Sequence, residues 1–114
     1  MEENKQYSTV IGYVFNEDGM YDYKYYFEGT PENIANFIMA YPYKDITITD
    51  GADNLILTTR MGFVDTCTDQ RFLANELLPA LLPRQLGDIE VEPLEFIQDE
   101  EYGNNFVHTM EQSL

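Results

Sequence analysis

Residues 6–28, QYSTVIGYVFNEDGMYDYKYYFE, predict a β-hairpin, and the rest of the predicted fold is built around it. Residues 6–15 are rich in β-branched and aromatic residues, which are typical of strands. A tight turn is expected at residues 16–19, because Gly19 can adopt a positive φ without strain. Side chains of the second strand, residues 20–28, alternate between two faces. The face that we expect to pack under helices carries Tyr21, Tyr23, Tyr25 and Phe27.

A helix is predicted directly after the hairpin. Thr30 can cap the helix, Pro31 suits its first position, and apolar residues recur at helical spacing until Pro42. Residues 45–50, DITITD, then predict a short strand, and residues 54–62 predict its antiparallel partner. This second unit has the same order of elements as the first, a hairpin followed by a helix.

The second helix is expected to start at a cap formed by Asp65 or Thr68. Pro79 lies inside its apolar run and should kink or end the helix, and Pro83 should end it in either case. Residues 88–96, DIEVEPLEF, predict a last strand. The resulting order β-β-α-β-β-α-β predicts an α+β fold, with an antiparallel sheet and both helices packed on one of its faces.

The length of 114 residues suits one domain. We expect residues 1–97 to form a single α+β domain and residues 98–114 to form an acidic C-terminal tail that is at most partly ordered. One cysteine, Cys67, cannot form an internal disulfide, and no apolar run has the length of a membrane span. The first residues lack the pattern of a signal peptide. A cytoplasmic, reducing setting is therefore expected.

The formal charge of −15 is the most unusual property of the sequence. Residues 85–114 contain eight acids and no Lys or Arg, so about half of the excess lies in the last quarter of the chain. Such a charge favours solubility, repels nucleic acids and membranes, and attracts basic partners. General solubility, or adaptation to a salty medium, would produce the same total.

A dense group of carboxylates lies between residues 88 and 101. On a strand, alternate carboxylates would lie about 7 Å apart, which is close to the phosphate spacing along one DNA strand. We therefore interpret these residues as a surface that occupies the basic groove of a partner such as a nucleic-acid-binding nuclease. The alternative is a solvated outer face of the sheet. The predicted partner-binding residues are Asp88, Glu90, Glu92, Glu95, Asp99, Glu100 and Glu101.

The tyrosine-rich hairpin allows two interpretations. Aromatic side chains on a strand can stack on bases, but such platforms lie in positive surroundings, and this hairpin has only Lys24 and Lys5 nearby. We therefore expect no direct binding to nucleic acid and assign the aromatic stripe to the core. Tyr13 and Tyr26 are expected on the opposite face and are secondary candidates for contact with a partner.

No metal, cofactor or catalytic site is predicted. Residues 50–54, DGADN, do not match the spacing of a calcium loop and are better explained as a turn, and residues 99–101 do not match it either. Cys67 and His108 each lack an evident partner for catalysis, and Cys67 is expected to be a small, half-buried packing residue. We therefore expect a binding protein rather than an enzyme.

In size, acidity and lack of catalytic residues, the chain is similar to small acidic proteins that phages and mobile elements use against host defences. These include anti-CRISPR and anti-restriction proteins that imitate DNA. The resemblance implies an inhibitor that occludes a basic nucleic-acid channel, for instance that of a Cas nuclease, and it assigns no role to individual residues. The alternative is a non-enzymatic accessory or regulatory domain that binds a host protein through Tyr13, Tyr26 and neighbouring apolar surface. The oligomeric state is left open.

Overall fold

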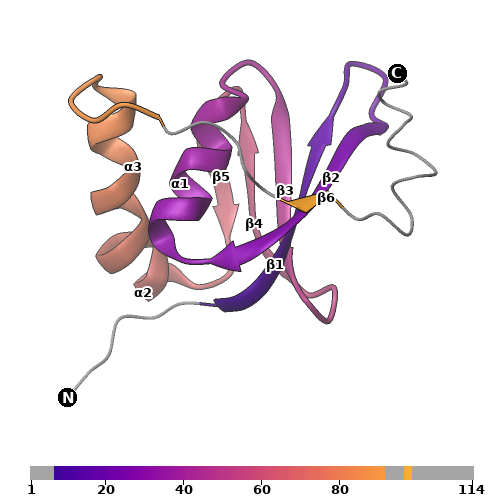
Figure 1. The fold of residues 1–114 in the computed structure, drawn as a ribbon, viewed down its shortest axis with the longest axis horizontal. Helices are drawn as coiled ribbons and strands as arrows, with labels where there is room; N and C mark the ends of the chain where they lie inside the picture. The colour runs from indigo at the N-terminus through magenta and orange to yellow at the C-terminus, as the bar shows by residue number, and fades with distance from the viewer. Residues whose placement is uncertain (1–6, 92–96, 99–114) are drawn as a thin grey trace.

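A computed structural model describes residues 7–91 and 97–98 of the chain. They form one antiparallel sheet in the order β5-β4-β3-β1-β2-β6, with helices on one of its sides (Figure 1). The strands are β1 (Tyr7–Phe15), β2 (Tyr21–Gly29), β3 (Asp45–Asp50), β4 (Leu55–Arg60), β5 (Phe63–Cys67) and β6 (Ile97–Gln98). The helices are α1 (Pro31–Ala40), α2 (Gln70–Phe72) and α3 (Leu78–Gln85), with a π-helical turn, η1 (Leu73–Leu77), between the last two. The predicted α+β class is confirmed.

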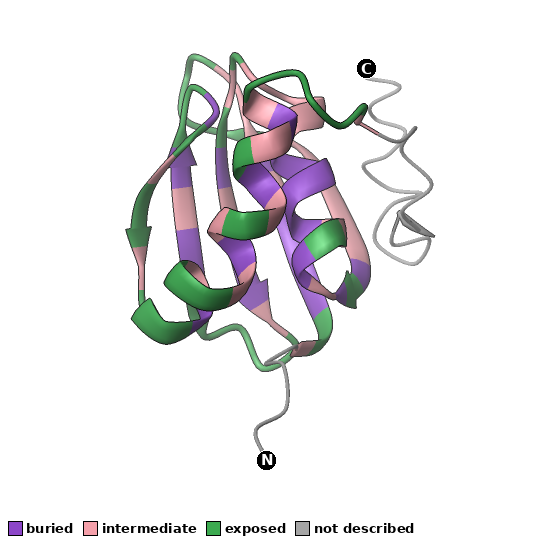
Figure 2. Ribbon diagram, turned by 90° about the vertical axis from the view of Figure 1, so that its left-hand side faces the viewer, coloured by how far each residue is buried: buried purple, intermediate pink, exposed green. Residues whose placement is uncertain are grey.

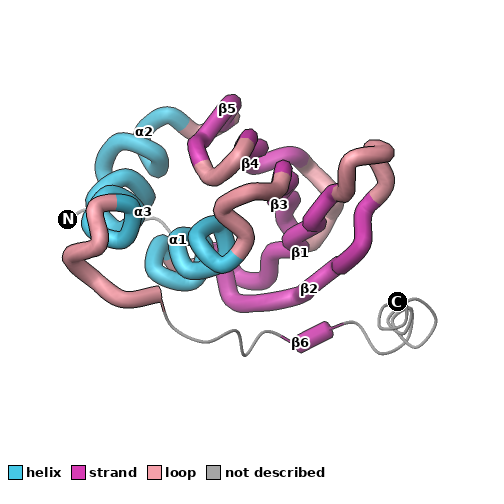
Figure 3. The backbone as a smooth tube through the Cα atoms, turned by 90° about the horizontal axis from the view of Figure 1, so that it is seen from above, coloured by secondary structure: helices cyan, strands magenta, loops and turns pink. Residues whose placement is uncertain are grey.

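The strand register sorts the side chains onto two faces of the sheet, because residues paired across antiparallel strands share a face. One face packs against the helices, which lie together on one side of the sheet (Figure 3). Its central row runs through Tyr25, Gly12, Ile48, Leu57 and Cys67. The buried residues of the sheet and of α1 meet between the two layers (Figure 2). Because each strand and helix turns one face to this core, its apolar residues recur with the period of a strand or a helix, and the sequence shows that period.

Helix α1 begins and ends at the residues that the sequence predicts. The hydroxyl of Thr30 accepts a hydrogen bond from the backbone N–H of Asn33 at 3.1 Å, and the helix ends at Ala40, before Pro42. The predicted turn at residues 16–19 is also present, with Gly19 at a φ of 83°. These local predictions are confirmed because caps and turns depend on only a few neighbouring residues.

Tyr21 departs from the predicted alternation of β2. Val14 pairs with Tyr23, whereas the next residue, Phe15, pairs with Tyr21, so the register skips Asp22. Such a bulge moves the following side chain to the other face. Tyr21 accordingly packs its ring against Tyr13, with ring centroids 5.2 Å apart, and not under the helices. The prediction for Tyr23, Tyr25 and Phe27 is confirmed, and the prediction for Tyr21 is wrong.

Strand β5 was not predicted, and its presence moves the start of the second helix. Met61 and Gly62 both have positive φ, 53° and 90°, and they turn the chain from β4 directly into β5. Asp69, rather than Asp65 or Thr68, then caps α2, since its carboxylate accepts from the N–H of Phe72 at 3.0 Å. Residue 65 lies within β5 and cannot begin a helix.

The helical segment passes through both prolines at which it was expected to kink or stop. The five-residue turn η1 ends at Leu77, two residues before Pro79 in the first turn of α3, and it is closed by the N–H of Leu78, which donates to the carbonyl of Leu73. Proline lacks an N–H and crowds the preceding carbonyls, and a π-turn relieves that conflict locally. Pro83 lies inside α3, which continues to Gln85. The predicted end at Pro83 is therefore two residues too early.

The predicted strand over residues 88–96 is wrong where the structure describes it. Residues 88–91 form a bend without strand pairing, held by the N–H groups of Asp88 and Ile89 on the carbonyl of Pro83 at 2.7 and 3.2 Å. Residues 92–96 and the predicted tail, 99–114, lie outside the described residues. The short strand β6 pairs with Tyr25 and Tyr26 of β2.

Candidate interaction surface

The face of the sheet opposite the helices, which we call the open face, is rich in aromatic and hydroxyl side chains. Within the described part of the chain, no helix covers it (Figure 3). The register places several cross-strand rows on this face, among them Lys24, Tyr13, Thr47, Thr58 and Thr66; Tyr26, Ile11, Thr49 and Leu55; Tyr21, Phe15 and Asp45; and Arg60 with Phe63. A sheet face of this composition is a candidate surface for contact with another molecule.

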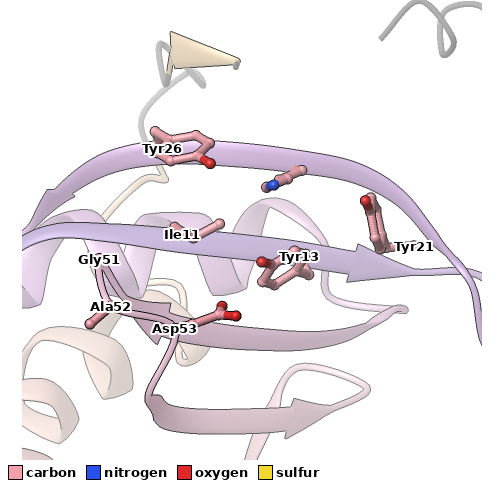
Figure 4. A pocket seen from close by; sticks show the side chains of 8 residues that line it. Ile11, Tyr13, Tyr21, Tyr26, Gly51, Ala52 and Asp53 are labelled. Carbon is pink, nitrogen blue, oxygen red and sulfur yellow. The ribbon is translucent and has the colours of Figure 1, made fainter. Parts of the chain in front are cut away.

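A shallow hollow of about 530 Å³, which we call the tyrosine hollow, lies at the β1–β2 end of the open face. Figure 4 shows Tyr21 and Tyr26 on one strand, Tyr13 and Ile11 on the next, and Asp53 beside them, with the helices behind the sheet. The turn that precedes β4 therefore forms one wall of the hollow. Its lining residues are Ile11, Tyr13, Tyr21, Lys24, Tyr26, Gly51, Ala52 and Asp53.

Lys24 places a positive charge among the aromatic rings of this hollow. Its Nζ lies 5.8 Å from the ring centroid of Tyr13 and 5.6 Å from that of Tyr26. Both distances lie within the range in which a cation is attracted to the face of an aromatic ring. The two tyrosines that the sequence singled out are thus brought together around one cation.

The turn at residues 50–54 positions Asp53 against Tyr13. The carboxylate of Asp50 accepts hydrogen bonds from the N–H groups of Ala52 and Asn54 at 2.8 and 2.9 Å, and the bond from Asn54 lowers the pKa of Asp50. Asp53 sits in this turn with a φ of 72°. Partial burial, followed by the charge of Asp53, raises the pKa of Tyr13. The interpretation of residues 50–54 as a turn is confirmed.

A second hollow of about 460 Å³ adjoins the first along the open face. Its lining contains three carboxylates, those of Glu17, Asp45 and Asp65, against one cation, Arg60. Together with Asp53 and Lys24, the two hollows carry four acidic and two basic side chains. The open face therefore combines aromatic surface with a negative rim.

Three large side chains of the open face are strongly exposed. Tyr21, Leu55 and Phe63 are 43, 42 and 66% exposed. Phe63 lies on the edge strand β5, paired with Arg60.

The predicted acidic surface lies only partly within the described residues. Asp88 and Glu90 are exposed in the bend after α3 and do not lie on a strand. Glu92, Glu95, Asp99, Glu100 and Glu101 lie outside the described residues. The strand from which the DNA-like spacing was inferred is therefore absent at the first two residues of the set, and the role of the whole set stays a prediction.

Sequence reasoning identified Tyr13 and Tyr26 but not Lys24 and Asp53, which complete the tyrosine hollow. The alternation of β2 places Lys24 on the same face as Tyr26, and that signal was available. No signal in the sequence indicated that Asp53 lies beside Tyr13, because this contact depends on how β3 and β4 pair with β1.

No feature of the described residues indicates catalysis. Cys67 is half-buried against the core, as predicted, and burial raises the pKa of its thiol, which disfavours the reactive thiolate. His108 lies outside the described residues. No cluster of three or more His, Cys, Asp or Glu among the described residues could hold a metal ion. No helix in the described ranges is long and apolar enough to cross a membrane.

The fold and the surface define a two-layer α+β domain with an aromatic, acid-rimmed sheet face that none of the described helices covers. Comparison with protein-family models, curated proteins and solved structures finds no match for the chain.

Proposed function

We propose that this protein is a non-catalytic binding protein that holds a basic segment of a partner protein against its open face. The observation that carries the proposal is the pair of tyrosines around a cation, Tyr13 and Tyr26 with Lys24, on a sheet face that no described helix covers, in a chain of charge −15. The two tyrosine rings already contact one positive group, and the negative charge of the protein attracts further positive groups from a partner.

Tyrosines supply binding energy in such an interface because they bury large apolar area at little conformational cost. Arginine and lysine side chains of the partner would lay their stems on the rings and meet the carboxylates of the rim. Asp53 lies in the tyrosine hollow, and Asp45 and Asp65 line the second hollow. This arrangement suits a basic protein segment better than a nucleic acid, whose phosphates the rim would repel.

A second candidate function is inhibition of a nucleic-acid-binding protein by imitation of DNA. The observation that favours it is the unbalanced acid content of residues 85–114, of which Asp88 and Glu90 are exposed in the structure. The partner would be a basic groove, such as that of a nuclease of host defence. The two candidates share a basic partner and differ in the surface that the partner contacts.

Binding of a hexa-arginine peptide, measured calorimetrically at about 0.1 and about 0.5 M salt, separates the two surfaces. Charge interactions at an exposed surface are screened over roughly 4–5 Å at the higher concentration, whereas aromatic contacts persist. We expect the double variant Tyr13→Ala/Tyr26→Ala to weaken binding about tenfold or more at both salt concentrations. Tyr43→Ala is the matched control, since Tyr43 is 79% exposed and does not line either hollow. Binding of the double variant with wild-type affinity would refute the open face as the site.

The DNA-mimic candidate is tested with a labelled DNA duplex bound to a basic, non-specific DNA-binding protein. The wild-type protein should displace the duplex, and charge reversal to Lys at Glu90, Glu92, Glu95 and Asp99 should abolish the displacement. The Tyr13→Ala/Tyr26→Ala variant should still displace it if the acidic segment acts alone. Failure of the wild-type protein to compete with DNA at low salt would exclude the mimic.

A further inference from the structure

We propose that the tyrosine hollow is a receptor site for one arginine side chain of the partner, and that Lys24 occupies it in the free protein as an internal competitor. The inference rests on the proposed function and names the side chain that the open face recognises. It differs from general attraction of basic segments because it predicts an effect that is specific to one lysine.

The first step concerns the position of the internal cation. Lys24 lies between Tyr13 and Tyr26, across β1 and β2, with its Nζ at nearly equal distances from the two ring centroids, 5.8 and 5.6 Å. A cation is stable there because both ring faces present negative charge density. The same place would therefore attract a cationic group supplied from outside.

The second step concerns the chemistry of the group that fits best. A guanidinium is planar, stacks on aromatic rings and at the same time donates hydrogen bonds within its plane to a carboxylate. The hollow offers both partners, since Tyr13 and Tyr26 present rings and Asp53 presents an exposed carboxylate beside Tyr13. An ammonium is a compact point charge and gains less from a flat aromatic surface. Arginine should thus bind better than lysine.

The third step concerns the displacement of Lys24. Two cations over the same pair of rings repel each other, so the ammonium of Lys24 must move away when a guanidinium enters. Its four-carbon stem and half-exposed position on β2 allow that movement within the folded protein. Removing the Lys24 charge should accordingly strengthen arginine binding, although it also removes a contact from the free protein.

The test compares Lys24→Met with Lys44→Met for binding of hexa-arginine and hexa-lysine peptides. Both variants lose one positive charge, so the long-range attraction is equal, but Lys44 lies in the α1–β3 connection and does not line the hollow. We expect Lys24→Met to bind hexa-arginine about two- to fivefold more tightly than Lys44→Met. Tyr26→Phe should retain binding and Tyr26→Leu should weaken it, because the ring and not the hydroxyl holds the cation. Equal affinities of the two lysine variants would overturn the proposal.

A spectroscopic readout reports the displacement itself. In the free protein the ring currents of Tyr13 and Tyr26 should shift the NMR signal of the Lys24 ε-methylene group upfield. Saturation with hexa-arginine should return that signal towards the position of an exposed lysine. A bound state in which the signal does not move would refute displacement.

Failure of this inference and failure of the proposed function give different results. If hexa-arginine binds the wild-type protein at the open face but Lys24→Met behaves like Lys44→Met, only the arginine site is refuted. If hexa-arginine does not bind, or binds regardless of Tyr13 and Tyr26, the proposed function fails as well.

Discussion

At the scale of single residues, Gly12 determines how closely the two layers approach. It lies in the middle of β1, and the ring of Phe37 from α1 lies directly over its backbone. A Cβ atom at this position would lie 2.5 Å from Cε2 and 2.6 Å from Cζ of Phe37. Glycine weakens a strand, and here the close packing of an aromatic ring explains its presence.

Gly12→Ala should lower the free energy of unfolding by about 1–3 kcal/mol, because the added methyl group overpacks the core. Gly51→Ala is the matched control. Its Cβ would meet only the carbonyl of Thr9 at 3.6 Å, an ordinary contact, so its stability should match or exceed that of the wild type. Urea unfolding of the three proteins measures both effects, and equal stability of Gly12→Ala and wild type would contradict the packing described.

At the scale of elements, the helical segment after β5 shows how neighbouring elements determine where a helix starts. Asp69 caps α2 and also accepts a hydrogen bond from the hydroxyl of Tyr7 at 3.0 Å. The ring of Tyr7 packs edge-on against Phe72, with the centroids 5.3 Å apart. Thr68, one of the two predicted caps, does not cap the helix; its hydroxyl donates a hydrogen bond to the carbonyl of Leu55 at 3.0 Å. The beginning of β1 thus helps to hold the start of α2.

Asp69→Ala should destabilise the protein by about 0.5–2 kcal/mol, the usual cost of losing an N-cap. Asp65→Ala should change stability by no more than about 0.5 kcal/mol, because Asp65 is exposed on an edge strand. Thermal unfolding monitored by circular dichroism distinguishes the two variants. A larger loss for Asp65→Ala would show that the helix starts where the sequence alone predicts.

At the scale of the whole molecule, half-buried tyrosines determine how stability responds to alkaline pH. Burial, the largest cause, raises the pKa of Tyr7, Tyr13 and Tyr41 above the ordinary value of 10.0. Tyr41 also donates a hydrogen bond to the hydroxyl of Tyr25 at 3.1 Å. These groups stay neutral in the folded protein at a pH at which they ionise in the unfolded chain. Their contribution to stability is complete below about pH 10 and is lost as the pH rises.

The protein should therefore lose stability between about pH 10 and pH 12, and Tyr41→Phe should lose less over that interval than the wild type. At pH 8 the variant should be less stable by about 0.5–1.5 kcal/mol, because it lacks the hydrogen bond to Tyr25. Urea unfolding of both proteins at about pH 8, 10 and 12 gives both numbers. An identical alkaline loss in the two proteins would show that Tyr41 is not the group responsible.

The features that depend only on neighbouring residues could be predicted from the sequence. The cap at Thr30, the turns at residues 16–19 and 50–54 and the end of α1 before Pro42 are local, and all are present. The two-residue period also placed Tyr13 and Tyr26 on the face away from the helices, and the core aromatics Tyr23, Tyr25 and Phe27 on the other. The α+β class could be predicted from the two-residue period of the strands and the helical period of the helices, because each element buries one apolar face.

Only the tertiary structure decided the features that depend on register and on contacts between distant segments. The bulge that skips Asp22 moves Tyr21 to the open face, and η1 lets the helix pass Pro79. Strand β5 forms by pairing with the edge of β4, although its own sequence shows little alternation of apolar and polar residues. The meeting of Lys24, the tyrosines and Asp53 likewise requires three strands to pair in one register, a long-range choice that no local pattern encodes.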